Sequence, residues 1–344
     1  MKKFLKISTF IISIFFLLFM KDAERISEID KIISGQKFNL LTWELKKLPK
    51  KTIDIFVSSE LTELEVKEIL QKENISNKNE LELFFQEEVT ELIKEELGKE
   101  FLFPPLAVSL EKPPKVLIVS PRDRISQKIA ILINNDISMK EIELIENTID
   151  SLNLSSIILD TGGFAAYPSI VNIKKDYNFL ISTISHEWLH HYLFFFPLGR
   201  SYFKGGDMIF INETLADLFA IQITNNKKTE ESISDKFFKP FMKETREKVD
   251  KLLINNEVEM AEKYMNQRVL ELNEKGYKVR KINQAYFAFY GNYGTSPSST
   301  HNYHKKLSDL LITYDSFAEF LNEIKMIDDV NKFESLINLR TLNN

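Results

Sequence analysis

The spacing of apolar residues changes along the chain and separates two regions. In 61–73 and 80–97, apolar residues recur every three to four positions with charged residues between them, a spacing that predicts amphipathic helices. Residues 52–57 differ because apolar and polar residues alternate there, which predicts a short strand. We therefore predict a mainly helical N-terminal region over residues 22–110.

A cluster of prolines marks the expected end of this region. Half of the ten prolines lie between residues 101 and 121, and such a cluster favours a domain boundary. Beyond it, three short apolar runs predict strands, and a segment that opens with a serine predicts an amphipathic helix. The strand candidates are 116–119, 129–133 and 157–159, and the helix candidate is 138–152.

Two further helices are predicted in the second half of the chain. Asp176 is a suitable N-cap residue, and the helix after it is expected to run to Phe196, where Pro197 ends it. A second helix is predicted over 212–224. The remainder is typical of helices, with one long loop at 291–302. A small sheet followed by a mostly helical half predicts an α+β fold.

The first 21 residues have the pattern of an export signal. Lys2, Lys3 and Lys6 precede or flank an apolar run, which is free of charge from Ile7 to Met20. No small-residue cleavage site follows, and this favours an uncleaved membrane anchor over a cleaved signal peptide. Both interpretations predict an exported protein, either anchored with its bulk outside the cytoplasm or secreted.

The composition excludes several classes of protein. The chain has no cysteine, which rules out disulfides, thiolate metal sites and cysteine nucleophiles. Its net charge of -5 and the lack of a dominant basic stripe argue against nucleic acid as a partner. Any transition-metal site must therefore use histidine and carboxylate ligands.

The candidate chemistry lies within the helix predicted after Asp176. His186, Glu187 and His190 form the pattern H-E-x-x-H, which a chain of this composition would contain by chance only roughly 0.007 times. Positions four apart share one helix face, so both imidazoles can bind one zinc ion. Glu187 lies beside that face and can reach a water molecule without being a ligand. His191 projects away from His190 and is not expected to be a ligand.

A zinc ion held by two imidazoles needs a third protein ligand and, if it is catalytic, an open coordination position. Glu213 is the leading candidate, because it lies on the next predicted helix and the connection contains one proline and three glycines that allow the chain to reverse. Asp207 and His301 are the alternatives. Asp217, one turn beyond Glu213, is suited to accept the remaining N–H of a ligand histidine.

H-E-x-x-H followed by N-E-x-x-A-D at 212–217 resembles the gluzincin group of zinc metallopeptidases, and the longer pattern resembles exported bacterial proteins of this type. The resemblance implies a zincin-like catalytic domain over 111–344, one Zn²⁺ ion and a peptide or protein substrate. It also implies that Glu187 is the general base and that Asp217 orients a ligand. The implied zinc ligands are His186, His190 and Glu213.

The same resemblance implies a substrate-binding strand before the metal helix, and 162–168 is the candidate, with a plain turn as the alternative. Hydrolysis also needs a donor to the oxyanion besides zinc. Tyr293 is preferred for this role and His301 is the second choice. Arg200 and Tyr202 follow a proline-glycine turn near the metal helix and could line a cleft, but a surface loop is the preferred interpretation.

The alternative function is that of a non-catalytic, zinc-stabilised binding module outside the cytoplasm. An intact Glu187 argues against it, because a structural zinc site has no need of that carboxylate.

Overall fold

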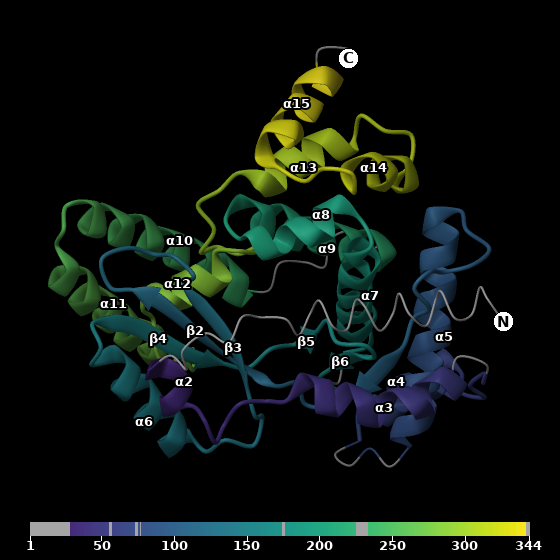
Figure 1. Cartoon of the computed structure of the whole chain (residues 1–344), viewed down its shortest axis with the longest axis horizontal. Coiled ribbons are helices and arrows are strands. Elements are labelled where there is room, and N and C mark those ends of the chain that lie inside the picture. Colours follow the sequence, from purple (N-terminus) through teal and green to yellow (C-terminus); the bar gives the residue numbers. More distant parts are fainter. Residues whose placement is uncertain are drawn as a thin grey trace.

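The computed structural model describes residues 28–54, 57–72, 75, 77–173, 176–224 and 233–341. The fold is α+β and mostly helical, with two small sheets surrounded by helices (Figure 1). Within the described ranges, no helix is both long and apolar enough to cross a bilayer. The N-terminal segment predicted as an anchor or signal peptide, residues 1–21, lies outside these ranges.

Four helices lie in the described part of the N-terminal region. Thr62 caps the start of the third of these helices with a capping box. Its side chain accepts a hydrogen bond from the backbone N–H of Glu65, and the Glu65 side chain accepts one from the backbone N–H of Thr62. The strand predicted at 52–57 is wrong for residues 52–54, which belong to a helix, and Val57 is 47% exposed and in no strand. Residues 55 and 56 lie outside the described ranges. The helices are α2 (Glu28–Ile32), α3 (Leu40–Asp54), α4 (Glu63–Leu70) and α5 (Lys78–Leu97).

The larger sheet has the order β3-β2-β4, with the central strand antiparallel to both neighbours. Successive side chains of β2 point to opposite faces. Leu117 and Val119 pack with α6, whereas Val116 and Ile118 pack against α12. The elements are β2 (Lys115–Pro121), β3 (Ile129–Ile133), β4 (Leu154–Leu159), α6 (Met139–Asp150) and α12 (Gln284–Tyr290). The three predicted strands and the helix after Ser138 are thus confirmed.

The smaller sheet has the order β1-β6-β5 and includes β1 (Val108–Leu110), β5 (Gly163–Phe164) and β6 (Ser169–Val171). The sequence analysis expected a strand over 162–168, with a plain turn as the alternative. Only Gly163 and Phe164 of that range form a strand, β5, which runs antiparallel to β6. The strand stops at Phe164 because the chain turns there, with the N–H of Ala166 donating to the carbonyl of Phe164 at 2.8 Å. β5 lies at the edge of the sheet.

The main core is built around α7 (Tyr177–Phe194) and α9 (Asp207–Ile223), which pack side by side. Asp176 caps α7 as predicted, and the helix ends two residues before Phe196. The core includes Phe85 of α5 as well as Trp188 of α7, so residues on both sides of the predicted boundary near 110 share it.

The connection between α7 and α9 contains α8 (Pro197–Ser201) and the 3-10 turn η1 (Tyr202–Lys204). The C-terminal helices flank this central pair: α13, α14 and α15 lie above α8 and α9 in Figure 1, and α10 and α11 lie at the far end beside the larger sheet. Their bounds are Ile233–Ile254 for α10, Val258–Glu274 for α11, Tyr303–Leu311 for α13, Phe317–Ile324 for α14 and Val330–Thr341 for α15.

Candidate metal centre

Two adjacent helices bring the predicted ligands together. His186 and His190 lie one turn apart on α7, and Glu213 faces them from α9. The Nε2 atoms of the two histidines are 3.1 Å apart, and Glu213 Oε2 lies 3.4 Å from that of His186 and 3.6 Å from that of His190. Each residue therefore directs one donor atom to a common point.

The donor set suits a zinc ion. One donor atom from each of His186, His190 and Glu213 lies within 4.8 Å of the other two, and no other group of three such residues in the described ranges meets this condition. Two imidazole nitrogens and one carboxylate oxygen form a ligand set typical of catalytic zinc. Asp207 and His301, the alternative third ligands, are not part of this group.

Asp217 lies where the sequence placed it, one turn beyond Glu213 on α9. Its Oδ1 atom is 3.2 Å from Nδ1 of His186, so Nδ1 donates its proton to the carboxylate. The Nε2 atom of His186 is thereby left without a proton and could bind a metal ion. Asp217 thus selects the tautomer of His186 that can bind a metal.

The electrostatic environment of the cluster favours a cation. Burial opposes protonation of His186, but hydrogen bonds to Asp217 and Glu213 outweigh it and raise its pKa well above the ordinary value. Burial alone would raise the pKa of Glu213, yet the charge of His190 and hydrogen bonds to both histidines lower it. The same arrangement that attracts a proton attracts a metal ion.

Glu187 is buried beside the cluster without belonging to it. Its side chain is only 8% exposed, and burial raises its pKa despite the nearby histidines. A raised pKa brings a carboxylate closer to the range in which a general base works at neutral pH. Glu187 thus lies beside the cluster, and its role as a general base stays a prediction.

Gly163 of β5 provides the space for Glu187. A Cβ atom at Gly163 would overlap the Glu187 carboxylate and lie 2.7 Å from Cγ2 of Thr183. A side chain at position 163 would therefore have to displace Glu187 or Thr183, where the edge strand lies against α7. The sequence analysis singled out this glycine only as part of a possible substrate strand.

Replacing Gly163 with alanine is expected to displace Glu187 and to reduce any hydrolysis by up to about 100-fold, the effect of misplacing a reactive group by roughly 1 Å. Metal binding should change little, because Glu187 is not among the ligands. Activity and bound metal are measured on the same preparation. Gly35→Ala is the control, since a Cβ at Gly35 would meet nothing within 4 Å. Equal activity of Gly163→Ala and Gly35→Ala would contradict this prediction.

Tyr202 belongs to the site, although the sequence analysis assigned it to a surface loop. α8 and η1 fold back so that its ring lies 6.2 Å from that of His190. The charge of Glu213, then burial and a hydrogen bond to Glu213, raise the pKa of Tyr202. The hydroxyl therefore stays protonated at neutral pH and can donate.

The two predicted oxyanion donors lie in different surroundings. Tyr293 is close to the cluster: burial and then the charge of Glu213, with a smaller contribution from Glu187, raise its pKa well above the ordinary value. His301 instead stacks on Phe210 with ring centroids 4.4 Å apart, and its Nε2 donates to the carbonyl of Gly291 at 3.0 Å. The contacts of His301 are those of a residue that fixes its own loop.

His191 points away from the metal ligands, in agreement with the sequence analysis. Its ring packs edge-on against Tyr167 at 5.5 Å and lies by the backbone of Ala165 and Ala166, in the segment between β5 and β6. Burial and the charge of His190 lower the pKa of His191 to about 4. This histidine is therefore neutral and links α7 to the edge of the smaller sheet.

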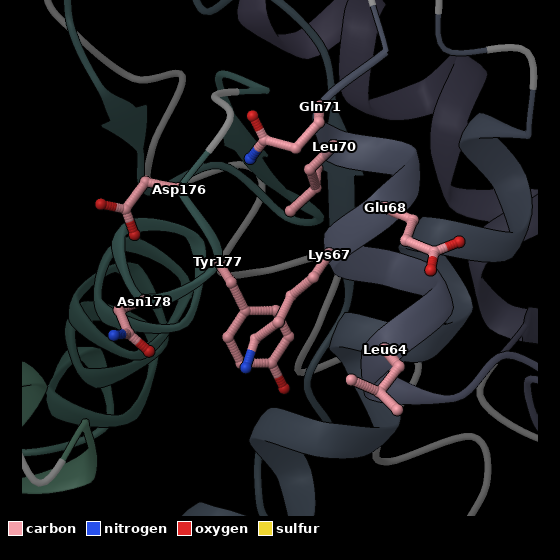
Figure 2. Close-up of a pocket in the computed structure, with 8 residues that line it drawn as sticks. All are labelled: Leu64, Lys67, Glu68, Leu70, Gln71, Asp176, Tyr177 and Asn178. Atoms are coloured by element: carbon pink, nitrogen blue, oxygen red, sulfur yellow. The ribbon is translucent and has the colours of Figure 1, made fainter.

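A separate surface pocket of about 530 Å³ lies between α4 and the start of α7 (Figure 2). Tyr177 and Lys67 meet there, with the ammonium 5.0 Å from the centre of the ring. Tyr177 precedes His186 by nine residues, or about 13 Å along the helix. None of the metal-cluster residues lines this pocket.

Comparison with protein-family models, with curated proteins and with solved structures found no match to this chain. Function is therefore inferred from the residues of the site themselves.

Proposed function

We propose that the protein is a zinc-dependent hydrolase that cleaves peptide bonds. One observation carries this proposal: His186, His190 and Glu213 direct three donor atoms to one point, while a fourth group, Glu187, is buried next to them and is not a ligand. A zinc ion in such a site supplies a Lewis acid that activates water and polarises a carbonyl group.

The protein's own residues supply the proton transfers. Glu187 takes a proton from the attacking water and passes it to the leaving amine, which its raised pKa favours. The missing side chain of Gly163 leaves the space that the Glu187 carboxylate occupies. Asp217 keeps the His186 ring in its metal-binding tautomer throughout.

The edge strand β5 offers a place for an extended substrate. β5 pairs only with β6 among the described strands, so its outer edge carries unpaired backbone groups. An extended peptide can add to such an edge through main-chain hydrogen bonds. Because Gly163 of β5 touches Glu187, a peptide bound there would pass directly by the general base.

Tyr202 and Tyr293 are the donors that best fit the developing oxyanion. Both hydroxyls stay protonated at neutral pH, since both pKa values are raised, and both lie near Glu213. We expect Tyr202→Phe and Tyr293→Phe each to lower kcat by about 10²- to 10³-fold with a smaller change in KM, because the hydrogen bond that each hydroxyl would donate to the oxyanion forms mainly in the transition state.

Steady-state kinetics on a cleaved peptide test this expectation. Tyr314→Phe is the control, because it removes a comparable bond from a tyrosine hydroxyl to Glu323, 2.8 Å long, in the C-terminal helices. If both site variants raised KM and left kcat unchanged, the tyrosines would only bind substrate.

The proposal as a whole is tested with full-length protein in detergent. Zinc content is measured by elemental analysis, and a peptide library is digested and read by mass spectrometry. One bound zinc ion without any cleavage would favour the non-catalytic, zinc-stabilised binding module instead. Export through residues 1–21 is part of the proposal, and it predicts that the catalytic part is accessible to protease added outside intact cells.

A further inference from the structure

The loop at 291–302, between α12 and α13, is connected to a metal ligand through one carboxylate. Thr295 Oγ1 in this loop donates to Oδ2 of Asp217 at 2.7 Å. The other oxygen of Asp217, Oδ1, lies 3.2 Å from Nδ1 of His186. The Asp217 carboxylate thus bridges a loop hydroxyl and an imidazole of the metal cluster.

The same loop is pressed against α9 next to a ligand. A Cβ atom at Gly294 would lie 2.5 Å from Oγ1 and 2.8 Å from Cγ2 of Thr214, the residue that follows Glu213. Only glycine allows the loop to approach this closely. Tyr293, which precedes Gly294, is thereby held near the cluster.

Other bonds fix the shape of the loop. His301 Nε2 donates to the carbonyl of Gly291 and so joins the two ends. Arg246 of α10 donates to the carbonyl of Ser298 at 3.2 Å. With these bonds in place, the position of Thr295 is determined by the fold.

We propose that Thr295 is a positioning residue for the metal site, acting on His186 through Asp217. The inference rests on the proposed zinc site. According to this proposal, zinc affinity depends on the loop that carries both Thr295 and Tyr293. The hydrogen bonds from Thr295 to Asp217 and from His186 to Asp217 would then connect the metal site to the loop that holds the oxyanion donor Tyr293.

The physical reason is the rotational freedom of the Asp217 side chain. This side chain is 18% exposed, so without Thr295 its free oxygen could turn to bond water. Rotation of the carboxylate would weaken its bond to Nδ1 of His186. Partners that orient a ligand histidine typically contribute about 10- to 100-fold to metal affinity.

The test is the zinc affinity of the full-length chain in detergent, measured by competition with a chromophoric chelator. Thr295→Ala is expected to weaken zinc binding by about 3- to 10-fold, less than the loss of a direct partner of the ligand. Thr295→Ser keeps the hydroxyl and should restore the affinity. Thr300→Ala, at another exposed threonine of the same loop, should leave it unchanged. Thr295 is itself exposed, so its loss is not expected to unfold the protein.

A double-mutant cycle separates this role from a general effect on the loop. In an Asp217→Ala background, Thr295→Ala should have no further effect on zinc affinity, because its route to His186 is gone. Equal losses in both backgrounds, or an unchanged affinity of Thr295→Ala alone, would overturn the inference.

The outcome is distinguishable from that of the proposed function. A chain that binds zinc with the expected dependence on Thr295 but cleaves no peptide would remove the hydrolase proposal and leave the coupling intact. If the chain cleaves peptides and binds zinc equally well with or without the Thr295 hydroxyl, the hydrolase proposal stands and the coupling through Thr295 is overturned. Failure of the unsubstituted chain to bind zinc would overturn both.

Discussion

Replacing Glu187 with glutamine is expected to lower kcat for peptide hydrolysis by about 10²- to 10⁴-fold, the usual contribution of a general base. The amide has the shape of the carboxylate and fits the space that Gly163 leaves, but it cannot accept the proton of the attacking water. Glu187 lies outside the group of three donors, so bound zinc should stay at one ion per chain.

Peptide digestion and zinc analysis on the same preparation check this result. Glu143→Gln, at an exposed position on α6, controls for the change of charge and should behave as the unsubstituted protein. Full activity of Glu187→Gln would exclude Glu187 as the base. Loss of zinc together with activity would instead indicate that Glu187 supports the metal site.

The local parts of the site were predictable because they depend on a single helix. Asp176 as N-cap, Pro197 as terminator and the i, i+4 spacing of His186 and His190 are all short-range signals, and the structure confirms the helix they predict. Glu213 was predictable from its place on the following helix, and the two helices do pack together.

The residues that the sequence analysis missed depend on contacts between distant segments. Tyr202 reaches Glu213 only because α8 and η1 fold the connection back on α7, and a tyrosine after a proline-glycine turn gives no local sign of this. Thr295 meets Asp217 across 78 positions of sequence. The one signal available for Tyr202 was its position in the connection between the two helices that were predicted to carry the ligands.

The errors in secondary structure have a similar cause. Over 52–57, alternation of apolar residues favoured a strand, but a strand needs a partner, and no neighbouring segment pairs with Val57 among the described residues. The helix α3 continues instead through Asp54, where only local hydrogen bonds are needed.

Replacing Glu213 with glutamine is expected to weaken zinc binding by more than about 100-fold, beyond the range found when only a partner of a ligand is lost. The amide keeps the volume of the buried side chain, which is 7% exposed, but removes the negative charge that would help to hold a cation between the two imidazoles. Zinc at 100 times the dissociation constant stabilises a protein by about 2.7 kcal/mol. The unsubstituted chain should therefore melt at a higher temperature when zinc is added, and Glu213→Gln should not at the same zinc concentration.

Glu187→Gln is the matched control for this measurement, because the same chemical change is made at a neighbouring carboxylate that is equally buried. It should keep the zinc-dependent rise in melting temperature, whereas Glu213→Gln should lose it. If both variants kept the rise, the ion would be bound elsewhere in the chain. If both lost it, Glu187 would be needed for binding, and its role as a base separate from the ligands would have to be given up.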